Sequence, residues 1–388
     1  MKGDEYNMHL NLVTCFNEKT DIFKYNNKGI KLEDMNISEG YYFVRNKRNN
    51  IKKICQQSDI KTEKGEELIF RVRKSKKNDF TIENPLNKKM PKTINNIKSL
   101  NNKLWYVLKS EKNENDSNNL DDYILNKNDI IKFGSSKYEV TEKHIENCDN
   151  IEKNNNKNKY DISNFNKNSQ SLFQIPEIKD ADYSNKNTKI LCRICLDGES
   201  SVDNPKIRLC NCNDYIHYEC LKRWIKTKII KRENLKKTVL SYYLKKFNCD
   251  VCVKPYLLKF KISGVNDKIY SLIDLNLPTD QNYIVLESLG FTSHNNNPKV
   301  IHIIKLIDSK IIFGKNEDSD IFDFGAYVSR VQAVIKYNNQ NGDVILENKS
   351  KHYDTLVLVK NPIKINEKKI DFQVGRTIIT ANLKKKLN

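Results

Sequence analysis

The sequence predicts a multidomain, mainly β protein in which a small, metal-stabilised finger separates two β-rich regions. Four chelating pairs of cysteine or histidine lie between Cys192 and Cys252, and short β-branched runs precede residue 148 and follow Lys259. The length of 388 residues is enough for several domains. We therefore expect four segments: 1–148, a β-rich domain; 149–188, a low-complexity flexible linker; 189–258, the finger; and 259–388, a β-sandwich.

In the amino-terminal segment, the runs Glu67 to Val72, Leu104 to Leu108 and Asp129 to Val140 are rich in β-branched and aromatic residues. Such runs predict strands, and no long helical pattern competes with them.

One internal echo links the two β-rich segments. Ile124 to Asn126 and Ile130 to Gly134 are similar to Ile365–Asn366 and Ile370 to Gly375. Each copy has an asparagine turn, an apolar run and a glycine before a further strand. Two explanations stay open, a duplicated β-sandwich and chance similarity.

Residues 149–188 are rich in Asn, Lys, Ser and Asp, which is typical of a flexible linker. The net charge of +19 is spread along the whole chain, with lysines interleaved with asparagines. This distribution favours loose attraction to acidic partners over specific nucleic-acid binding. The polar start of the chain and the lack of a long apolar run lead us to expect a soluble protein of the cytosol or nucleus, without a membrane span.

The chelating pairs supply seven thiols and one imidazole. Structural zinc is four-coordinate and takes Cys sulfur and His nitrogen, so eight ligands fit two Zn²⁺ ions. A chain of a reducing compartment is not expected to form disulfides from such pairs. The predicted zinc ligands are Cys192, Cys195, Cys210, Cys212, His217, Cys220, Cys249 and Cys252.

The order of the pairs suggests two interleaved sites. One ion would be held by Cys192, Cys195, His217 and Cys220, and the other by Cys210, Cys212, Cys249 and Cys252. Each site would be closed, which argues against metal catalysis. Structural zinc stabilises a fold by roughly 10 kcal/mol, so the finger needs little apolar core.

Four Cys, one His and three Cys is an order shared by two families. It occurs in the RING-CH (RING-variant) finger of ubiquitin ligases and in the PHD finger, a reader of histone tails. Cys192-Arg-Ile-Cys195-Leu196, Cys210-x-Cys212 and His217-x-x-Cys220-Leu221-x-x-Trp224 resemble RING-CH, and Pro255 follows the last pair. The apolar residues between Cys220 and Cys249 predict a largely helical insertion.

Two features depart from RING-CH. Four residues separate Cys212 from His217, a spacing normal for PHD. Val253 stands where active RING ligases often have Arg or Lys, which puts ligase activity in question but not the fold. A PHD-type histone-tail reader and a non-catalytic interaction adaptor therefore stay open as alternatives.

The RING-CH resemblance implies that Ile194, Trp224 and Pro255 dock a ubiquitin-conjugating enzyme charged with ubiquitin. Ligases of this type act by positioning the thioester, so we name no catalytic residue. Each of the three residues also has a structural alternative: Trp224 as core, Ile194 as packing and Pro255 as a turn.

After Lys259, strand-like runs alternate with turn signals, which predicts an antiparallel β-sandwich. The predicted strands are Tyr283 to Glu287, Val300 to Leu306, Lys310 to Phe313, Val331 to Tyr337, Asp343 to Glu347, Thr355 to Val359 and Thr377 to Ala381.

Within this region, Ile311-Ile-Phe-Gly314-Lys315 and Ser329-Arg330 resemble a forkhead-associated (FHA) domain. The resemblance covers roughly Tyr283 to Leu383 and implies phosphothreonine-peptide binding by Lys315, Ser329 and Arg330. If the internal echo reflects a duplication, the amino-terminal domain is FHA-like as well. Lys315 replaces the family's Arg, Gln332 its His and Asp354 its Gly. Lysine cannot form the planar bidentate pair that arginine forms. Phosphopeptide binding and a purely scaffolding role are both left open.

Overall fold

The computed structural model describes residues 6–15, 30–46, 51–54, 66–76, 79–85, 100, 102–109, 122–145, 175–179, 181–182, 190–245, 247–265, 268–289, 299–307, 310–350 and 352–385. The chain divides into two compact units. We call the first the sandwich unit; it comprises Met1–Leu172, Gln281–Leu289 and Ile304–Asn388. The second, the zinc unit, comprises Phe173–Asp280 and Gly290–Ile303.

The sandwich unit is built from β-strands. They are β1 (Tyr6–Cys15), β2 (Ile30–Ile37), β3 (Tyr41–Arg45), β4 (Ile51–Ile54), β5 (Glu67–Lys74), β6 (Phe80–Glu83), β7 (Leu104–Leu108), β8 (Tyr123–Ile124), β9 (Ile130–Phe133), β10 (Ser136–His144), β19 (Tyr283–Ser288), β21 (Ile311–Gly314), β22 (Ile321–Phe322), β23 (Ala333–Asn338), β24 (Asp343–Asn348), β25 (Thr355–Leu358), β26 (Ile363–Lys364), β27 (Ile370–Val374) and β28 (Thr377–Lys385).

A long sheet runs through this unit in the order β19-β10-β9-β25-β7-β27-β28-β1-β2. Two smaller sheets, β22-β21-β23-β24-β8 and β26-β6-β5-β3-β4, complete two sandwiches with it. Phe133 of β9 stacks on Phe313 of β21 with ring centroids 4.1 Å apart, which joins the layers of one sandwich. In the other, Arg45 of β3 donates to the carbonyl of Val374 in β27 over 2.8 Å.

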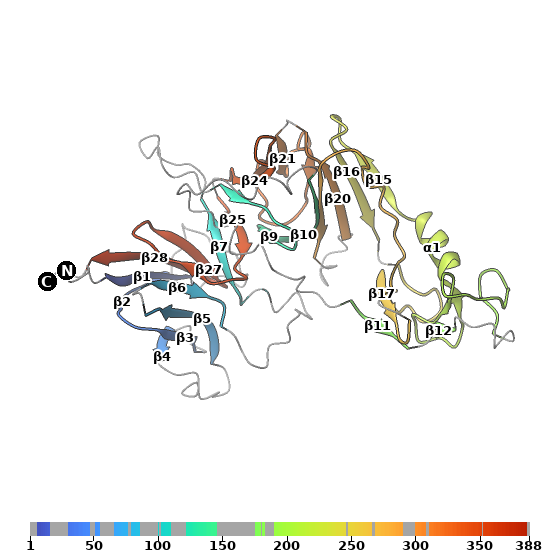
Figure 1. Cartoon of the computed structure of the whole chain (residues 1–388), viewed down its shortest axis with the longest axis horizontal. Helices are drawn as coiled ribbons and strands as arrows, with labels where there is room; N and C mark the ends of the chain where they lie inside the picture. The colour runs from blue at the N-terminus through green and yellow to red at the C-terminus, as the bar shows by residue number, and fades with distance from the viewer. Residues whose placement is uncertain are drawn as a thin grey trace. The chain divides into compact units, whose positions relative to one another are not determined.

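Strands from the two ends of the chain alternate in these sheets, as the blue and red arrows of Figure 1 show. β1 pairs with β28, β6 with β26, β8 with β24, β9 with β25 and β10 with β19. Residues 1–148 and 259–388 were expected as separate domains, whereas the structure combines most of both in one unit. Strand patterns specify a face and a length but not a distant partner, which is why the sequence did not reveal this pairing. The expected linker, 149–188, lies largely outside the described residues.

The zinc unit is an irregular module of short elements. They are β11 (Glu177–Ile178), β12 (Ala181–Asp182), β13 (Lys206–Ile207), β14 (Ile216–His217), α1 (Tyr218–Lys226), β15 (Ile230–Glu233), β16 (Val239–Leu244), β17 (Lys259–Ile262), β18 (Ile269–Ser271) and most of β20 (Lys299–Lys305).

The expected helical insertion after Cys220 is wrong for most of its length. α1 ends at Lys226, and the antiparallel hairpin of β15 and β16 follows. The turn is fixed by Asn234, whose Oδ1 accepts the backbone amides of Thr238 and Val239. An asparagine that replaces backbone partners in this way favours a turn over a helix. Among the described residues, no helix is long and apolar enough to span a membrane.

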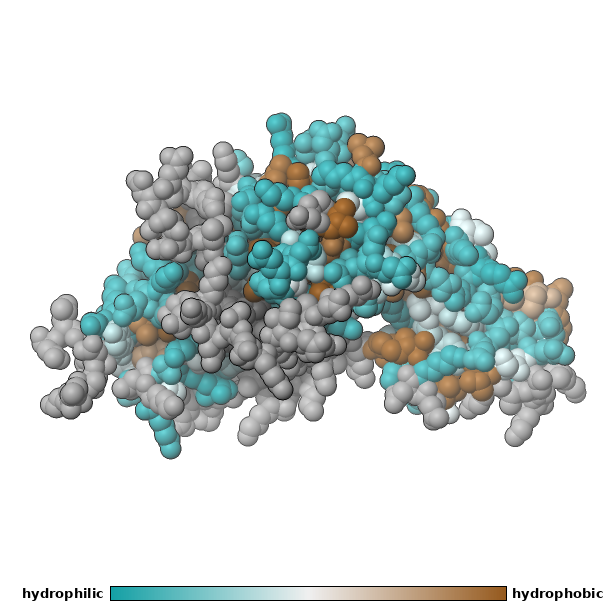
Figure 2. Space-filling view, turned by 45° about the horizontal axis from the view of Figure 1, so that its top comes forward, coloured by the Kyte–Doolittle hydropathy of each residue, from teal (hydrophilic) through white to brown (hydrophobic). Residues whose placement is uncertain are grey.

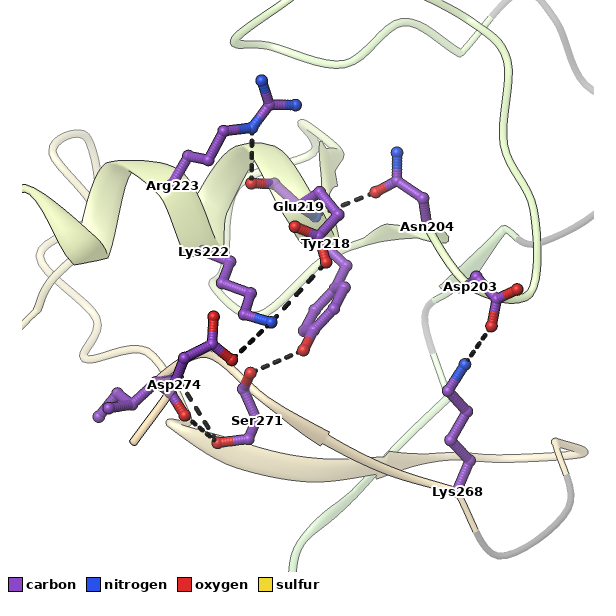
Figure 3. A network of polar contacts seen from close by, with 10 residues as sticks. Asp203, Asn204, Tyr218, Glu219, Lys222, Arg223, Lys268, Ser271 and Asp274 are labelled. Atoms are coloured by element: carbon purple, nitrogen blue, oxygen red, sulfur yellow. Dashed lines mark hydrogen bonds and ion pairs between the residues drawn. The ribbon is translucent and has the colours of Figure 1, made fainter. Parts of the chain in front are cut away.

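The zinc unit also extends past residue 258, the expected end of the finger. Tyr218 of α1 donates to the carbonyl of Ser271 in β18 over 2.7 Å, and Lys222 pairs with Asp274 at 2.8 Å (Figure 3). Tyr270 donates to the carbonyl of Val202. The hairpin of β17 and β18 is therefore part of the module that holds the metal ligands, and not of the sandwich.

Candidate zinc centres and phosphate-binding loop

The eight predicted zinc ligands form two separate groups in the zinc unit. Cys192, Cys195, His217 and Cys220 offer ligand atoms that all lie within 4.8 Å of one another, and so do Cys210, Cys212, Cys249 and Cys252. These are the two interleaved sets that the spacing predicts. Two four-ligand groups of Cys sulfur and His nitrogen fit two tetrahedral zinc ions with no open position.

Two of the chelating pairs lie in loops that have the same backbone conformation. The backbone amide of Leu196 donates to the carbonyl of Cys192, and that of Val253 donates to the carbonyl of Cys249. Both residues adopt positive φ, 62° for Leu196 and 58° for Val253. A positive φ is strained for a bulky or β-branched side chain and persists where the surroundings enforce it. Each loop brings two thiols of one zinc site together, and a bound zinc ion would stabilise that conformation.

The Nε2 atom of His217 fixes the orientation of the ring, and Nδ1 faces the cysteine thiols. Its Nδ1 lies 3.2 Å from Cys195 Sγ and 3.9 Å from Cys220 Sγ. Its Nε2 lies 2.5 Å from the backbone oxygen of Glu199, which fixes Nε2 as the protonated nitrogen. Metal-binding histidines typically donate their second ring nitrogen in this way. The structure thus assigns Nδ1 as the ligand atom.

The thiol groups differ in how readily they ionise. Burial by itself raises the pKa of Cys192, but the backbone amides of Cys195 and His217 outweigh it and lower the pKa to about 7. At Cys249, burial is likewise outweighed by the amides of Cys252 and Val251, and the pKa falls to about 5. Burial and the neighbouring thiols Cys195 and Cys192 raise the pKa of Cys220 to about 12. Neighbouring thiols thus oppose one another's ionisation. A bound cation between them is what allows several thiolates to exist at this spacing.

Two cations that the sequence analysis did not single out hold the module together. Lys206 is fully buried, and its Nζ donates to the carbonyls of Ile190 and Gly198 at 2.8 and 2.7 Å and pairs with Asp182 at 3.2 Å. Arg193 links the two zinc sites, because its Nη1 lies 3.8 Å from Cys249 Sγ. Lysine and arginine are common in this chain, so no local signal marked either residue.

The three residues expected to dock a conjugating enzyme lie in segments that contact one another. Ile194 is 46% exposed, and the neighbouring Arg193 reaches Cys249. The ring of Trp224 packs edge-on against Tyr256 at 6.2 Å, directly after the exposed Pro255. Lys228 Nζ lies 3.7 Å above the Trp224 ring, which is half-buried. Leu196 and Val253, which lie near Ile194 and Pro255 in the sequence, are also exposed.

The FHA-like motif forms a loop at the end of β21. The backbone amide of Lys315 donates to the carbonyl of Ser329 over 2.9 Å, so two of the three predicted phosphate-binding residues are adjacent. A Cβ on Gly314 would lie 2.1 Å from the carbonyl oxygen of Arg330, which explains the glycine at this close approach. Lys315 and Arg330 are exposed, and Ser329 is half-buried.

Gln332 holds this loop in place through side-chain hydrogen bonds. It is fully buried; its Oε1 accepts the amide of Ser329, and its Nε2 donates to the carbonyl of Tyr353 over 2.8 Å. Ser350 joins the network, with its Oγ 2.6 Å from that of Ser329. The glutamine that replaces the family's histidine thus holds the loop through both ends of its amide. The arrangement presents a hydroxyl beside two cations, the donors that a phosphate group needs.

Comparison with known families identifies both modules. Residues 192–252 match the family model of the RING-variant domain, and residues 311–378 match that of the FHA domain. No curated protein and no solved structure matches the chain significantly. The chain therefore contains a RING-variant domain followed by an FHA domain, as its motifs suggest.

Proposed function

We propose that this protein is a RING-CH ubiquitin ligase, or a ligase subunit, that recruits phosphorylated clients through its FHA domain. The observation that carries the proposal is the RING-variant finger with Ile194 exposed beside the zinc sites. An exposed isoleucine on a metal-rigidified loop is a suitable anchor for a partner's apolar groove.

The finger would contribute geometry and not covalent chemistry. Both zinc sites are closed, so the metal serves to hold the loops in place. Ile194, Trp224 and Pro255 would bind the conjugating enzyme and keep its thioester-linked ubiquitin in a reactive orientation, which lowers the entropic part of the barrier. The metal-thiolate sites suit a reducing compartment, so we expect the protein in the cytosol or nucleus.

Ubiquitin discharge from a panel of charged conjugating enzymes tests this step. The full chain should accelerate discharge with at least one enzyme, and Ile194→Ala should reduce the acceleration at least about tenfold, the equivalent of ~1.4 kcal/mol of binding. Leu235→Ala is the matched control, because Leu235 is fully exposed at the tip of the β15–β16 hairpin and should have no effect. No acceleration with any enzyme, together with binding of histone-tail peptides, would favour the PHD-type reader.

The client-binding step rests on the loop of Lys315, Ser329 and Arg330. We expect a phosphothreonine peptide to bind and its unphosphorylated form not to bind. Arg330→Ala should weaken binding about tenfold or more, because it removes a charge-assisted phosphate contact. Lys310→Ala removes the same charge at the other end of β21 and should leave affinity unchanged. Equal binding of both peptide forms would leave the domain with a scaffolding role.

A further inference from the structure

The two sandwiches share a sequence motif at the same structural position. Asp79-Phe-Thr-Ile-Glu-Asn84 covers β6 with one residue on either side, and Asp343-Val-Ile-Leu-Glu-Asn348 covers β24. Glu83 pairs with Arg73 of β5, and Glu347 pairs with Lys336 of β23. These partners are also equivalent, since Arg73 lies opposite Thr81 and Lys336 opposite Ile345, the third residue of each motif.

The register of the next strand is equivalent as well. In β6, Ile82 pairs with Ile363 and Thr81 with Lys364 of β26. In β24, Leu346 pairs with Tyr123 and Ile345 with Ile124 of β8. The fourth and third residues of the motif thus pair with the first and second residues of a short strand in both sandwiches. The strand in each case comes from the other half of the chain.

The hairpins that follow these short strands are equivalent and are placed in the same crosswise manner. β9 turns into β10 at Gly134, and β27 turns into β28 at Gly375, both with φ of 54°. The amino-terminal hairpin pairs with β25, and the carboxy-terminal hairpin pairs with β7. Each hairpin therefore completes the sandwich whose other strands come from the opposite half.

β7 and β25 meet at a local two-fold axis. They are antiparallel, with Val357 opposite Tyr106 and Thr355 opposite Leu108. Val357 and Tyr106 are themselves equivalent, because Val357 pairs with Ile131 of one hairpin and Tyr106 with Phe372 of the other. The flanking asparagines obey the same symmetry: Asn84 donates to the carbonyl of Val359, and Asn348 to that of Leu108. A self-complementary contact of this kind is typical of two copies related by a two-fold axis.

We infer that the sandwich unit consists of two FHA-like repeats that have exchanged their carboxy-terminal hairpins within one chain. The first repeat supplies β1 to β7 and receives β26 to β28. The second supplies β19 and β21 to β25 and receives β8 to β10. Exchange of an identical element between copies preserves every contact within each sandwich, which is why equivalent registers survive it.

The exchange makes the phosphate-binding loop depend on residues from the amino-terminal half. Tyr138 of β10 donates to the buried carboxylate of Asp323 over 2.8 Å. The amide of Ser135 donates to the carbonyl of Ala326, and a Cβ on Gly134 would lie 2.3 Å from the carbonyl oxygen of Tyr327. The loop that leads to Ser329 and Arg330 therefore rests on the received hairpin.

The first repeat uses the position of Lys315 differently. Its counterpart of Lys315 is Arg45, because Phe43 lies opposite Phe70 as Phe313 lies opposite Ala333. Arg45 is half-buried and donates to the carbonyl of Val374 and to Thr377 Oγ1, both in the received hairpin. Arg45 therefore holds the received hairpin, whereas its counterpart Lys315 is exposed.

Crosslinking of the full chain tests the exchange. In the exchanged fold, Asn7 of β1 lies opposite Lys384 of β28, and the equivalent Lys143 of β10 lies several strands away in the same sheet. Without exchange, β1 would instead pair with β10. We would prepare Asn7→Cys/Lys384→Cys and Asn7→Cys/Lys143→Cys, react each folded protein with a short bismaleimide, and identify the joined peptides by mass spectrometry. The wild-type chain controls for the native cysteines.

We expect a crosslink between positions 7 and 384 and none between positions 7 and 143. The opposite result would overturn the exchange. A mixture of isotopically heavy and light chains makes the test specific to one chain, because crosslinks should then join only peptides of equal label. Crosslinks between heavy and light peptides would show that the hairpins are exchanged between two molecules, and this too would contradict the inference.

Discussion

In the zinc unit, the residues that fix the fold lie much closer together in sequence than those of the sandwich unit. Each chelating pair of the finger spans a few positions, as Cys192 and Cys195 do. In the sandwiches, Asn348 hydrogen-bonds the carbonyl of Leu108 across 240 residues, and Arg45 reaches Val374 across 329. The first unit is organised by a metal and the second by long-range strand pairing.

This difference separates the roles of the two units. A metal can hold exposed, strained loops rigid with little core, so apolar residues such as Ile194 can stay on the surface for a partner. Apolar residues are scattered over a mostly polar surface in Figure 2. The sandwiches bury most of their large apolar side chains, although Leu32 and Phe324 are exposed, and the candidate recognition residues lie in a loop at the end of a strand. The two repeats therefore share a strand framework but use it differently. The second repeat exposes Lys315 and Arg330 in a loop, and in the first repeat Arg45 contacts the received hairpin.

The largest difference between the two units is expected when zinc is removed. A chelator is expected to unfold the segment from Cys192 to Cys252, since structural zinc contributes roughly 10 kcal/mol to such folds. All eight assigned zinc ligands lie in the zinc unit, so the strands of the sandwiches should stay protected. Hydrogen–deuterium exchange of the full chain, followed by mass spectrometry, measures both units at once. Unchanged protection of the finger would contradict the metal assignment, and loss of protection in β7 and β25 would contradict the independence of the units.

A smaller effect is expected from the buried cation of the zinc unit. Lys206→Met would leave Asp182 and two carbonyls without their partner, and breaking a buried pair typically costs about 3–5 kcal/mol. The thermal midpoint of the zinc unit should fall, with no change in the sandwiches.

The control is Lys268→Met, because Lys268 pairs with the exposed Asp203 (Figure 3). Such a surface pair contributes little to stability, because solvent screens it. Equal effects of the two substitutions would show that Lys206 is not a structural cation.

The smallest effect is expected where the received hairpin supports the proposed phosphate-binding loop. Tyr138→Phe removes one hydrogen bond to Asp323, worth about 1 kcal/mol, and keeps the ring contacts with Phe133 and Phe313. Phosphothreonine-peptide affinity should fall a few fold, as measured by calorimetry. Tyr337→Phe removes a hydroxyl elsewhere in the same sandwich and should leave affinity unchanged. Identical affinities for both variants would mean that the loop does not depend on the hairpin.

The sequence predicted what is local and missed what is distant. The zinc ligands and their division between two sites are confirmed, because spacing alone determines which atoms can chelate. The strands after Lys259 are confirmed to within a few residues, since β-branched runs and turn residues are local signals. The helical insertion was wrong because Leu235 and Val239 matched a helical period while Asn234 formed a turn.

The supporting contacts could not be predicted in the same way. Lys206 is distinguished by the carbonyls that fold around it, and Tyr138 by its contact with Asp323 185 residues away. The echo between Gly134 and Gly375 was visible in the sequence, yet only strand registers show on which half each hairpin lies. Tertiary partners, and not residue patterns, decide these features.

Ubiquitin transfer to paired client peptides tests the central claim most directly. Two peptides, identical except for phosphorylation of one threonine and each carrying an acceptor lysine, would be offered to the full chain with its conjugating enzyme. The account predicts faster transfer to the phosphorylated peptide, and rates that become equal in Arg330→Ala. Equal rates with the wild-type chain would contradict a ligase whose FHA domain selects its clients.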